Sequence, residues 1–114
     1  MLTQDLRIVA AEGVWVVRAG GAVIGESTRA LELCDGTRPS EIYFPRDSIA
    51  MAFLEPADRT ATSRSLGEAR FFDLVLKSVT IPHAAWSYET PQPDAARLAG
   101  HIAFATDQVT IERV

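Results

Sequence analysis

The sequence has 114 residues, a length that suits one domain over residues 1–114 and leaves little room for two. Hydrophobic residues make up 47% and charged residues 23% of the chain, values typical of a folded protein that exclude disorder and fibrous repeats. The 11 basic residues against 15 acidic ones give a net charge of -4. Because nucleic-acid binding needs a net-positive face, this balance argues against DNA or RNA as a partner.

Cysteine content and hydropathy predict the setting of the chain. Cys34 is the only cysteine, so neither an internal disulfide nor a zinc site built from several cysteines can form. The first residues lack the basic-then-apolar order of a secretory signal. The longest uncharged stretch near the start, residues 13–17, is far shorter than the roughly 20 apolar residues that cross a bilayer. We therefore expect a cytoplasmic protein without membrane contact.

The first predicted elements are two strands joined by a hairpin. Residues 14–18 are rich in β-branched and aromatic side chains, which favour a strand. Gly20 and Gly21 follow and supply the flexibility that a tight hairpin needs, so residues 22–26 are predicted to form the returning strand.

Two more strands are predicted before the middle of the chain. Residues 30–33 alternate apolar and polar side chains and are followed by Asp35-Gly36, a strong turn signal. Residues 41–44 predict another strand, ended by Pro45, which cannot donate a hydrogen bond to a sheet.

The middle of the chain mixes one ambiguous run, one predicted loop and two strands. Residues 49–54 are apolar and too short to assign, although their shortness favours a strand. Residues 55–67 have few large apolar side chains, which is typical of a loop. Strands are predicted over residues 68–76 and over residues 79–81, the latter ending at Pro82.

One short helix and two closing strands are predicted near the C-terminus. Pro93 and Asp94 suit the first turn of a helix and Gly100 suits the position just after its end. Residues 102–104 and 109–111 favour strands joined at Asp107. Strands at this spacing with one short helix predict a mainly β protein, an antiparallel sandwich or barrel.

Four stretches resemble the domain of unknown function 427 family, and together they cover most of the chain. The resemblance implies a β-tent-like fold, in which two antiparallel sheets lean together and leave a cleft. Other β-tent proteins often hold zinc through paired cysteines, which this chain lacks, so no metal and no cofactor are expected. The four stretches are GGAVIGESTRALEL (20–33), IYFPRDSI (42–49), LEPADRTATSRSLGEARFF (54–72) and AWSYETPQPDAARLAGHIAF (85–104).

One loop departs from the family pattern. Where the family typically has Thr-x-Cys-Pro-Tyr-Lys-Gly, residues 61–67 read Ala-Thr-Ser-Arg-Ser-Leu-Gly, so only the glycine is shared. A nucleophilic cysteine or an anion-binding lysine at these positions is therefore missing. Arg64 brings a positive charge nearby, two positions away from the family's lysine. The departure indicates either a different ligand or a loop without chemistry.

Nucleophilic catalysis and metal binding find little support in the residue spacing. Ser63 needs a base to act as a nucleophile, and the chain has only His83 and His101. His83 with Asp47 or Asp58 would complete a triad only by spatial proximity, and ordinary loop chemistry explains Ser63 as well. No two histidine, aspartate or cysteine side chains have a ligand spacing such as H-x-x-x-H.

Arginines and one aromatic pair remain as candidate binding residues. Arg46 is suited to clamp an anionic ligand and Asp47 to accept a proton, or the two stiffen the turn after the strand. Arg29 either forms a cross-strand ion pair or points into the cleft. If residues 86–88 form a strand, Trp86 and Tyr88 share one face and line either the core or a pocket, with Tyr88 the better candidate for the cleft.

These observations lead to three hypotheses. The first is binding of a small polar or anionic molecule in the inter-sheet cleft. The second is an enzyme, a transferase or hydrolase, with Asp47 or His83 as general base. The third is a structural or protein-interaction module whose exposed sheet edge pairs with a partner or a second copy, which makes a homo-oligomer an open alternative. The predicted ligand-binding residues of the first hypothesis are Arg29, Arg46, Asp47, Ser63, Arg64 and Tyr88.

Overall fold

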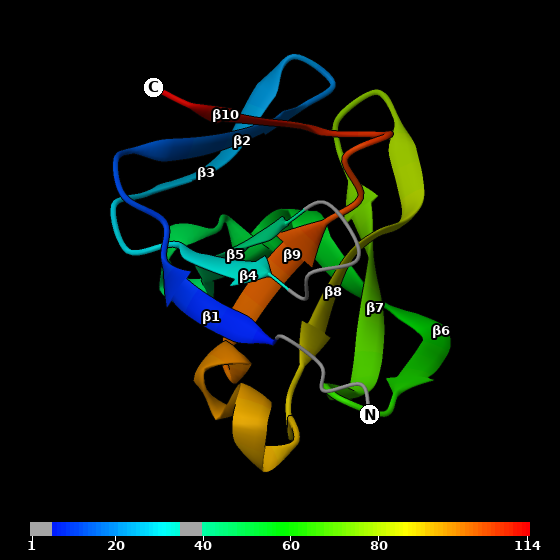
Figure 1. The fold of residues 1–114 in the computed structure, drawn as a ribbon. Helices are drawn as coiled ribbons and strands as arrows, with labels where there is room; N and C mark the ends of the chain where they lie inside the picture. The colour runs from blue at the N-terminus through cyan, green and yellow to red at the C-terminus, as the bar shows by residue number, and fades with distance from the viewer. Residues whose placement is uncertain (1–5, 35–39) are drawn as a thin grey trace.

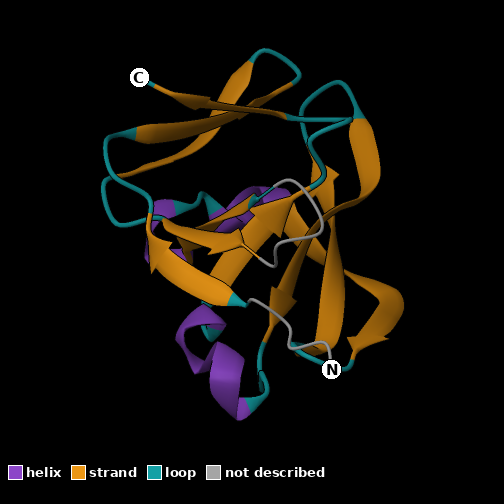
Figure 2. Ribbon diagram, viewed as in Figure 1, coloured by secondary structure: helices purple, strands orange, loops and turns teal. Residues whose placement is uncertain are grey.

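Two antiparallel sheets of unequal size lean against each other (Figures 1 and 2). The computed structural model describes residues 6–34 and 40–114, and ten strands occur within these ranges. The large sheet contains, in order across it, β1 (Arg7–Ala10), β4 (Leu31–Cys34), β5 (Glu41–Pro45), β9 (His101–Phe104), β8 (Thr80–Tyr88), β7 (Gly67–Val75) and β6 (Leu54–Ser63). The small sheet contains β10 (Thr110–Arg113), β2 (Trp15–Ala19) and β3 (Ala22–Ser27). The predicted mainly β fold with two antiparallel sheets is confirmed.

The predicted hairpin at residues 14–26 forms the β2–β3 pair of the small sheet. Gly20 and Gly21 have φ angles of 54° and 82°, a region that glycine adopts without steric cost. β4 and β5 confirm the next two predicted strands, and the turn predicted between them at residues 35–36 lies outside the described residues. β1, which pairs with β4, was not predicted; three of its four residues are exposed, so it lacks a hydrophobic pattern.

Residues 55–67 are not the loop that their composition predicts, because most of them belong to β6. This strand pairs with β7 from Leu54 opposite Leu74 to Ser63 opposite Gly67, with an irregularity between Pro56 and Thr60. It lies at the edge of the large sheet and most of its residues are exposed. An edge strand tolerates polar residues and proline because only one side is hydrogen-bonded, so hydrophobic pattern does not reveal it.

The strand predicted to end at Pro82 continues through it to Tyr88 as β8. The β7–β8 pairing shifts register between Phe72 and Leu74, which lets the chain pass the proline that cannot donate a hydrogen bond. His83 follows with a φ of 54°, in the left-handed region that non-glycine residues rarely adopt. A bulge therefore replaces the predicted strand end.

The helical segments are all short. The predicted C-terminal helix is confirmed as a 3-10 helix, η3 (Pro93–Leu98), rather than an α-helix. Residues 49–54 were expected to favour a strand; instead Ile49 makes a single bridge to Gly25 and is followed by η2 (Met51–Phe53). A further 3-10 turn, η1 (Arg46–Ser48), precedes it. Within the described ranges, no helix is long and apolar enough to cross a membrane.

The two closing strands separate into different sheets, β9 in the large one and β10 in the small one. This exchange carries the end of the chain from the large sheet to the small one, where β10 pairs with β2 (Figure 1). The main hydrophobic cluster lies between the sheets and includes Val17 and Ile24 of the small sheet with Phe44, Leu74 and Ile102 of the large one. Burial of these side chains holds the sheets together.

A second cluster covers the other face of the large sheet. Tyr43 and Tyr88 lie in it with η3's Leu98, whereas Phe44, the neighbour of Tyr43, belongs to the first cluster. This is the alternation expected of a strand, in which successive side chains point to opposite faces. The large sheet is therefore packed on both faces.

Candidate functional site

A pocket of about 470 Å³ is lined by residues of both sheets; it reaches from Trp15, Ile42 and Ile111, which pack against the first hydrophobic cluster, to Trp86, which packs against the second. Trp15 of β2 and Ile111 of β10 line it from the small sheet, and Ile42, Trp86 and Phe104 line it from the large one. Ser40, Glu41 and Thr106 complete the described lining. We call this pocket the inter-sheet cleft. Its volume falls within the range of small-molecule sites in proteins, about 300–1,000 Å³.

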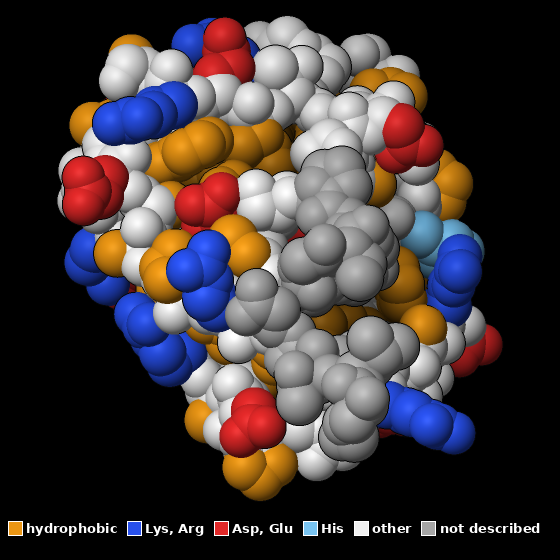
Figure 3. Space-filling view, viewed as in Figure 1, with side chains coloured by type: hydrophobic (Ala, Val, Ile, Leu, Met, Phe, Trp, Pro, Cys, Tyr) orange, Lys and Arg blue, Asp and Glu red, His pale blue; other side chains and the backbone are white. Residues whose placement is uncertain are grey.

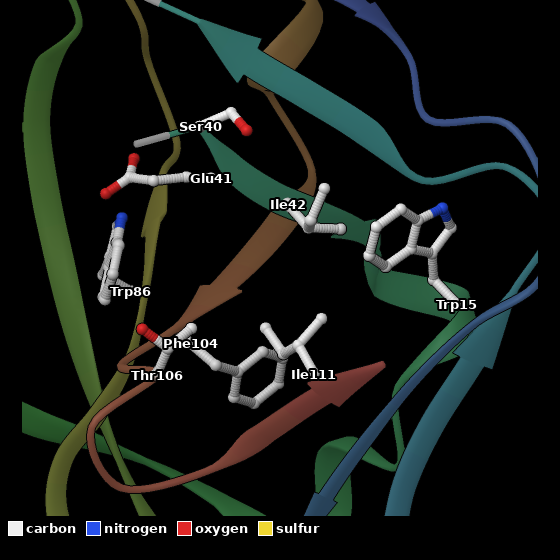
Figure 4. Close-up of a pocket in the computed structure, with 8 residues that line it drawn as sticks. All are labelled: Trp15, Ser40, Glu41, Ile42, Trp86, Phe104, Thr106 and Ile111. Atoms are coloured by element: carbon white, nitrogen blue, oxygen red, sulfur yellow. The ribbon is translucent and has the colours of Figure 1, made fainter. Parts of the chain in front are cut away.

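The inter-sheet cleft has two chemically different ends. Trp86 and Glu41 lie at one end and Trp15 at the other, with Ile42 and Phe104 between them (Figure 4). The Trp15 end is apolar, whereas the Trp86 end holds a carboxylate. Hydrophobic side chains are also visible at the surface between the small and the large sheet (Figure 3).

A chain of hydrogen bonds fixes the Trp86 end. The Trp86 indole N–H donates to the Tyr43 hydroxyl over 3.2 Å, and this hydroxyl donates to Oε1 of Glu41, also over 3.2 Å. Burial raises the pKa of Tyr43 well above its ordinary value, and the negative charge of Glu41 raises it further. The phenol therefore stays protonated and keeps donating to Glu41, so the orientation of the carboxylate is set by the protein.

The Trp15 end and the rim are also held by hydrogen bonds. The Trp15 indole N–H donates to the carbonyl oxygen of Glu12 over 3.1 Å. At the rim, the Ser40 hydroxyl donates to Oε2 of Glu32 on β4 over 2.7 Å. Both indole N–H groups are thus used within the protein, and the rings present their carbon faces and edges to the inter-sheet cleft.

Arg29 and Asp47, both predicted binding residues, form an ion pair outside the inter-sheet cleft. The Arg29 Nη2 to Asp47 Oδ1 distance is 2.8 Å, and the two side chains are 63% and 71% exposed. The Arg29 amide also donates to the Ser27 hydroxyl, which fixes the end of β3. Of the alternatives for Arg29, the structure shows an exposed ion pair that joins the end of β3 to η1.

Arg46, predicted to pair with Asp47 or an anion, instead contacts Glu89. Its guanidinium donates to Oε2 of Glu89, which also accepts from the Ser87 hydroxyl. The guanidinium carbon lies 5.8 Å from the centre of the Phe72 ring. Arg46 and Glu89 line a separate surface pocket with Arg70. The guanidinium of Arg46 thus already has an anionic partner.

Ser63 and Arg64 lie at the turn between β6 and β7, away from the inter-sheet cleft. The Ser63 hydroxyl accepts the amide of Leu66 over 3.3 Å and lies 3.4 Å from the Ser65 hydroxyl, contacts that order the turn. Arg64 lines a different surface pocket together with Asp94 of η3. The two residues adjoin each other but meet none of the other predicted binding residues.

Tyr88 lies next to the inter-sheet cleft rather than in it. Its side chain is buried in the second hydrophobic cluster, with its ring centre 6.5 Å from that of Tyr43. It also lines a smaller pocket of about 180 Å³ that shares Glu41 and Trp86 with the inter-sheet cleft. β8 confirms that Trp86 and Tyr88 belong to one strand, but Trp86 is the one that reaches the inter-sheet cleft.

The structure does not bring Ser63 and His83 together. Ser63 is opposite Gly67 on β7, whereas the His83 amide donates to the side chain of Asp73 further along β7. At about 3.3 Å per residue these two positions on β7 are about 20 Å apart.

His83 has its own neighbours on the β6–β7–β8 surface. Its ring packs edge-on against Phe71, with ring centres 6.1 Å apart. The Arg59 guanidinium lies over the same Phe71 ring at 4.8 Å and places Nη1 3.4 Å from Nδ1 of His83. This contact keeps an arginine beside the imidazole where a catalytic triad would need a carboxylate.

In the part of the chain that the structure describes, no three or more His, Cys, Asp or Glu side chains lie close enough together to bind a metal ion. His101 uses Nδ1 to donate to the carbonyl oxygen of Ala99 over 3.0 Å. Cys34, half-buried at the end of β4, is a free thiol.

Sequence reasoning considered only one residue of the inter-sheet cleft, Trp86. It missed Trp15 and Ile111 on the small sheet and Glu41 at the start of β5, because these residues come from distant parts of the chain and share no motif. The available signal was the tryptophan count: the chain has two tryptophans, and both line this pocket.

Comparison with known proteins gives a family but no activity. A family profile described as a domain of unknown function (DUF427) matches residues 7–114. No curated protein matches the chain.

Proposed function

Because the chain belongs to the DUF427 family, a domain family without an assigned function, we propose a function from the geometry of the inter-sheet cleft: it binds a small organic molecule. The observation that carries this proposal is that both tryptophans of the chain line one pocket from different sheets. Tryptophan provides a large, flat and rigid contact surface for a ligand. An apolar pocket with a few fixed polar groups is the usual form of a small-molecule site.

The lining supports a ligand with a mainly apolar body. Ile42, Phe104 and Ile111 form the walls between the two indoles (Figure 4). The described lining residues include no lysine or arginine, so an anion would find no opposite charge among them. The anionic ligand expected from the sequence would need a positive charge such as that of Arg46 or Arg64, and both residues lie outside the inter-sheet cleft. Binding of an anion at those surfaces stays a prediction.

Two tryptophan resonances make the proposal directly testable. We would screen small aromatic and heterocyclic compounds by thermal shift and by the indole N–H signals in a nitrogen–proton correlation spectrum. A ligand at a hundredfold over its dissociation constant stabilises the fold by about 2.7 kcal/mol. Binding in the inter-sheet cleft moves the indole signals of Trp86, Trp15 or both.

Two variants separate the inter-sheet cleft from the arginine surfaces. Trp15→Leu removes the flat wall at one end and is expected to weaken a compound that moves the Trp15 signal by about tenfold. Arg64→Ala, at the β6–β7 turn, serves as the control and is expected to leave the affinity unchanged. Binding that is lost in Arg64→Ala and kept in Trp15→Leu would overturn the proposal.

A further inference from the structure

Among its described lining residues, the inter-sheet cleft has few side-chain hydrogen-bond donors left for a ligand, the Thr106 hydroxyl apart, and it has the Glu41 carboxylate as an acceptor. Its two indole N–H groups donate to Glu12 and Tyr43, and the Ser40 hydroxyl donates to Glu32. The Tyr43 hydroxyl behind the wall donates to Glu41. A ligand therefore has to bring its own donors, because an unmatched polar group loses the hydrogen bonds that it made with water.

Among the described residues that line the inter-sheet cleft, the charge is negative and lies at one end. Glu41 lines the pocket beside Trp86, and Glu32 lies one hydrogen bond beyond the rim through Ser40. Neither carboxylate has an arginine or lysine partner among the contacts of the described residues. A carboxylate at the edge of an apolar pocket attracts a cation and repels an anion more strongly than it would in open water.

The aromatic rings favour the same sign of charge. The face of an indole carries negative electrostatic potential, so an ammonium group near the Trp86 ring is attracted by the ring as well as by Glu41. The ring is held in place, because its N–H donates to Tyr43 and Phe71 packs against it with ring centres 6.1 Å apart. A fixed ring and a fixed carboxylate are pre-organised for one charged group.

The opposite end of the inter-sheet cleft has no charge among its described residues. Trp15, Ile111 and Ile42 surround it, and the pocket extends from Glu41 to this end (Figure 4). A ligand that fills the pocket thus meets acceptors and π faces at one end and hydrocarbon at the other.

We infer that the ligand of the inter-sheet cleft is an amphipathic organic cation, with an ammonium group between Glu41 and Trp86 and an apolar body that extends toward Trp15. This inference rests on the proposed function, because it assigns the chemical class of the ligand for the same pocket. Glu41 is the counter-ion that sets the specificity, and the distance between the two tryptophans sets the length of the apolar body.

Three probes of similar shape and different charge test which sign of charge the inter-sheet cleft prefers in a ligand. Phenylbutylammonium, phenylbutanol and 5-phenylpentanoate share one phenylbutyl body and differ in the head group. We expect the ammonium to bind about tenfold more tightly than the alcohol, and the carboxylate to bind most weakly. Calorimetry gives the dissociation constants, and the two indole signals report the site.

Glu41→Gln tests the counter-ion. Glutamine keeps an oxygen that accepts from Tyr43, so the fold is expected to persist, which thermal unfolding checks. The preference for the ammonium over the alcohol is expected to disappear in Glu41→Gln. Glu68→Gln, an exposed position on β7 away from the inter-sheet cleft, changes the net charge equally and should leave the preference intact.

The length of the probe tests the orientation. Benzylammonium is expected to move the Trp86 signal alone, and the longer phenylbutylammonium to move both indole signals. The reverse pattern, in which the short cation moves only Trp15, would overturn the assignment of the head group to Glu41.

The outcomes distinguish the ligand class from the existence of the site. Equal affinity for the alcohol and the ammonium, or an unchanged preference in Glu41→Gln, overturns the inference that the ligand is a cation. Shifts of the indole signals would in that case still support the inter-sheet cleft as a small-molecule site. If none of the probes and none of the screened compounds moves an indole signal, the proposed function itself fails.

Discussion

The inter-sheet cleft and the arginine-bearing surfaces differ in how their polar groups are used. At the surfaces, Arg29 pairs with Asp47 and Arg46 with Glu89, so these two arginines already have anionic partners within the protein. In the inter-sheet cleft, a few polar groups are fixed by neighbours, and one of them, the Glu41 carboxylate, still faces the pocket. The charged residues Arg29, Arg46 and Asp47 of the family stretches thus form ion pairs at the surface. The pocket combines residues inside those stretches, such as Trp86, with residues outside them, such as Trp15 and Glu41.

Solvent exposure explains the difference in energetic terms. An ion pair as exposed as Arg29–Asp47 contributes about 0–1 kcal/mol, because water screens both charges. The same charges partly removed from water interact more strongly with each other and with a ligand. A few polar groups in a partly enclosed pocket can therefore select a ligand, whereas each exposed arginine contributes little.

The largest change in stability is expected at the bridge between Gly25 of β3 and Ile49. A Cβ on Gly25 would lie 2.6 Å from the carbonyl oxygen of Ser48 and 2.5 Å from Cδ1 of Ile49. Because the backbone oxygen has little freedom to move, Gly25→Ala is expected to lower the free energy of unfolding by about 3 kcal/mol, the upper end of overpacking costs. Denaturant unfolding measures it.

The same substitution should disturb the inter-sheet cleft, because Gly25 and Ile49 form the bridge that joins β3 to the segment after η1. Val23→Ala on the same strand, where the side chain is 51% exposed, is the control and should cost less than about 1 kcal/mol. If Gly25→Ala and the native chain have the same free energy of unfolding, the close contact between Gly25 and Ile49 does not contribute to the packing of the sheets.

A smaller effect is expected at the wall of the inter-sheet cleft. Tyr43→Phe removes the acceptor of the Trp86 N–H and the donor to Glu41, and should cost about 1–2 kcal/mol at neutral pH. Because burial and Glu41 raise the pKa of Tyr43, the folded state keeps the phenolic proton to higher pH than the unfolded chain does. The stabilisation is complete below the unfolded pKa of about 10 and falls as the pH rises above it.

Alkaline unfolding curves measure this contribution. The native chain should lose up to about 1.4 kcal/mol per pH unit through Tyr43 above pH of about 10, and Tyr43→Phe should lack that part of the slope. The phenolate absorbance band gives an independent measure of tyrosine ionisation, since Tyr43 should ionise only when the protein unfolds. Identical slopes in the two proteins would contradict the raised pKa of Tyr43.

The smallest effect is expected at the exposed ion pair. Arg29→Ala and Asp47→Ala should each change the free energy of unfolding by about 0–1 kcal/mol, and a double-mutant cycle should give a coupling in the same range that shrinks with added salt. Neither change should alter binding in the inter-sheet cleft. A coupling well above about 1 kcal/mol, or a loss of ligand binding in the inter-sheet cleft, would instead favour a binding site that includes Arg29 and Asp47.

Local sequence patterns predicted the strands that have a buried face. β2 and β3 were recognisable from their β-branched residues and the glycine pair between them, because such patterns depend only on neighbours in the chain. β6 was not, since most of its side chains are exposed and hydrogen bonds to β7 stabilise it. Pro82 misled the prediction because a bulge, which pairing with β7 creates, accommodates it inside β8.

Local patterns along the chain are enough to predict the mainly β fold, the hairpin at Gly20-Gly21, the short C-terminal helix and the family. The inter-sheet cleft depends on tertiary packing, which brings Trp15, Glu41, Trp86 and Ile111 from four strands to one pocket. The physical reason is distance along the chain. Hydrophobic periodicity and turn chemistry act over a few residues, whereas a pocket depends on which sheets pack together and in which register.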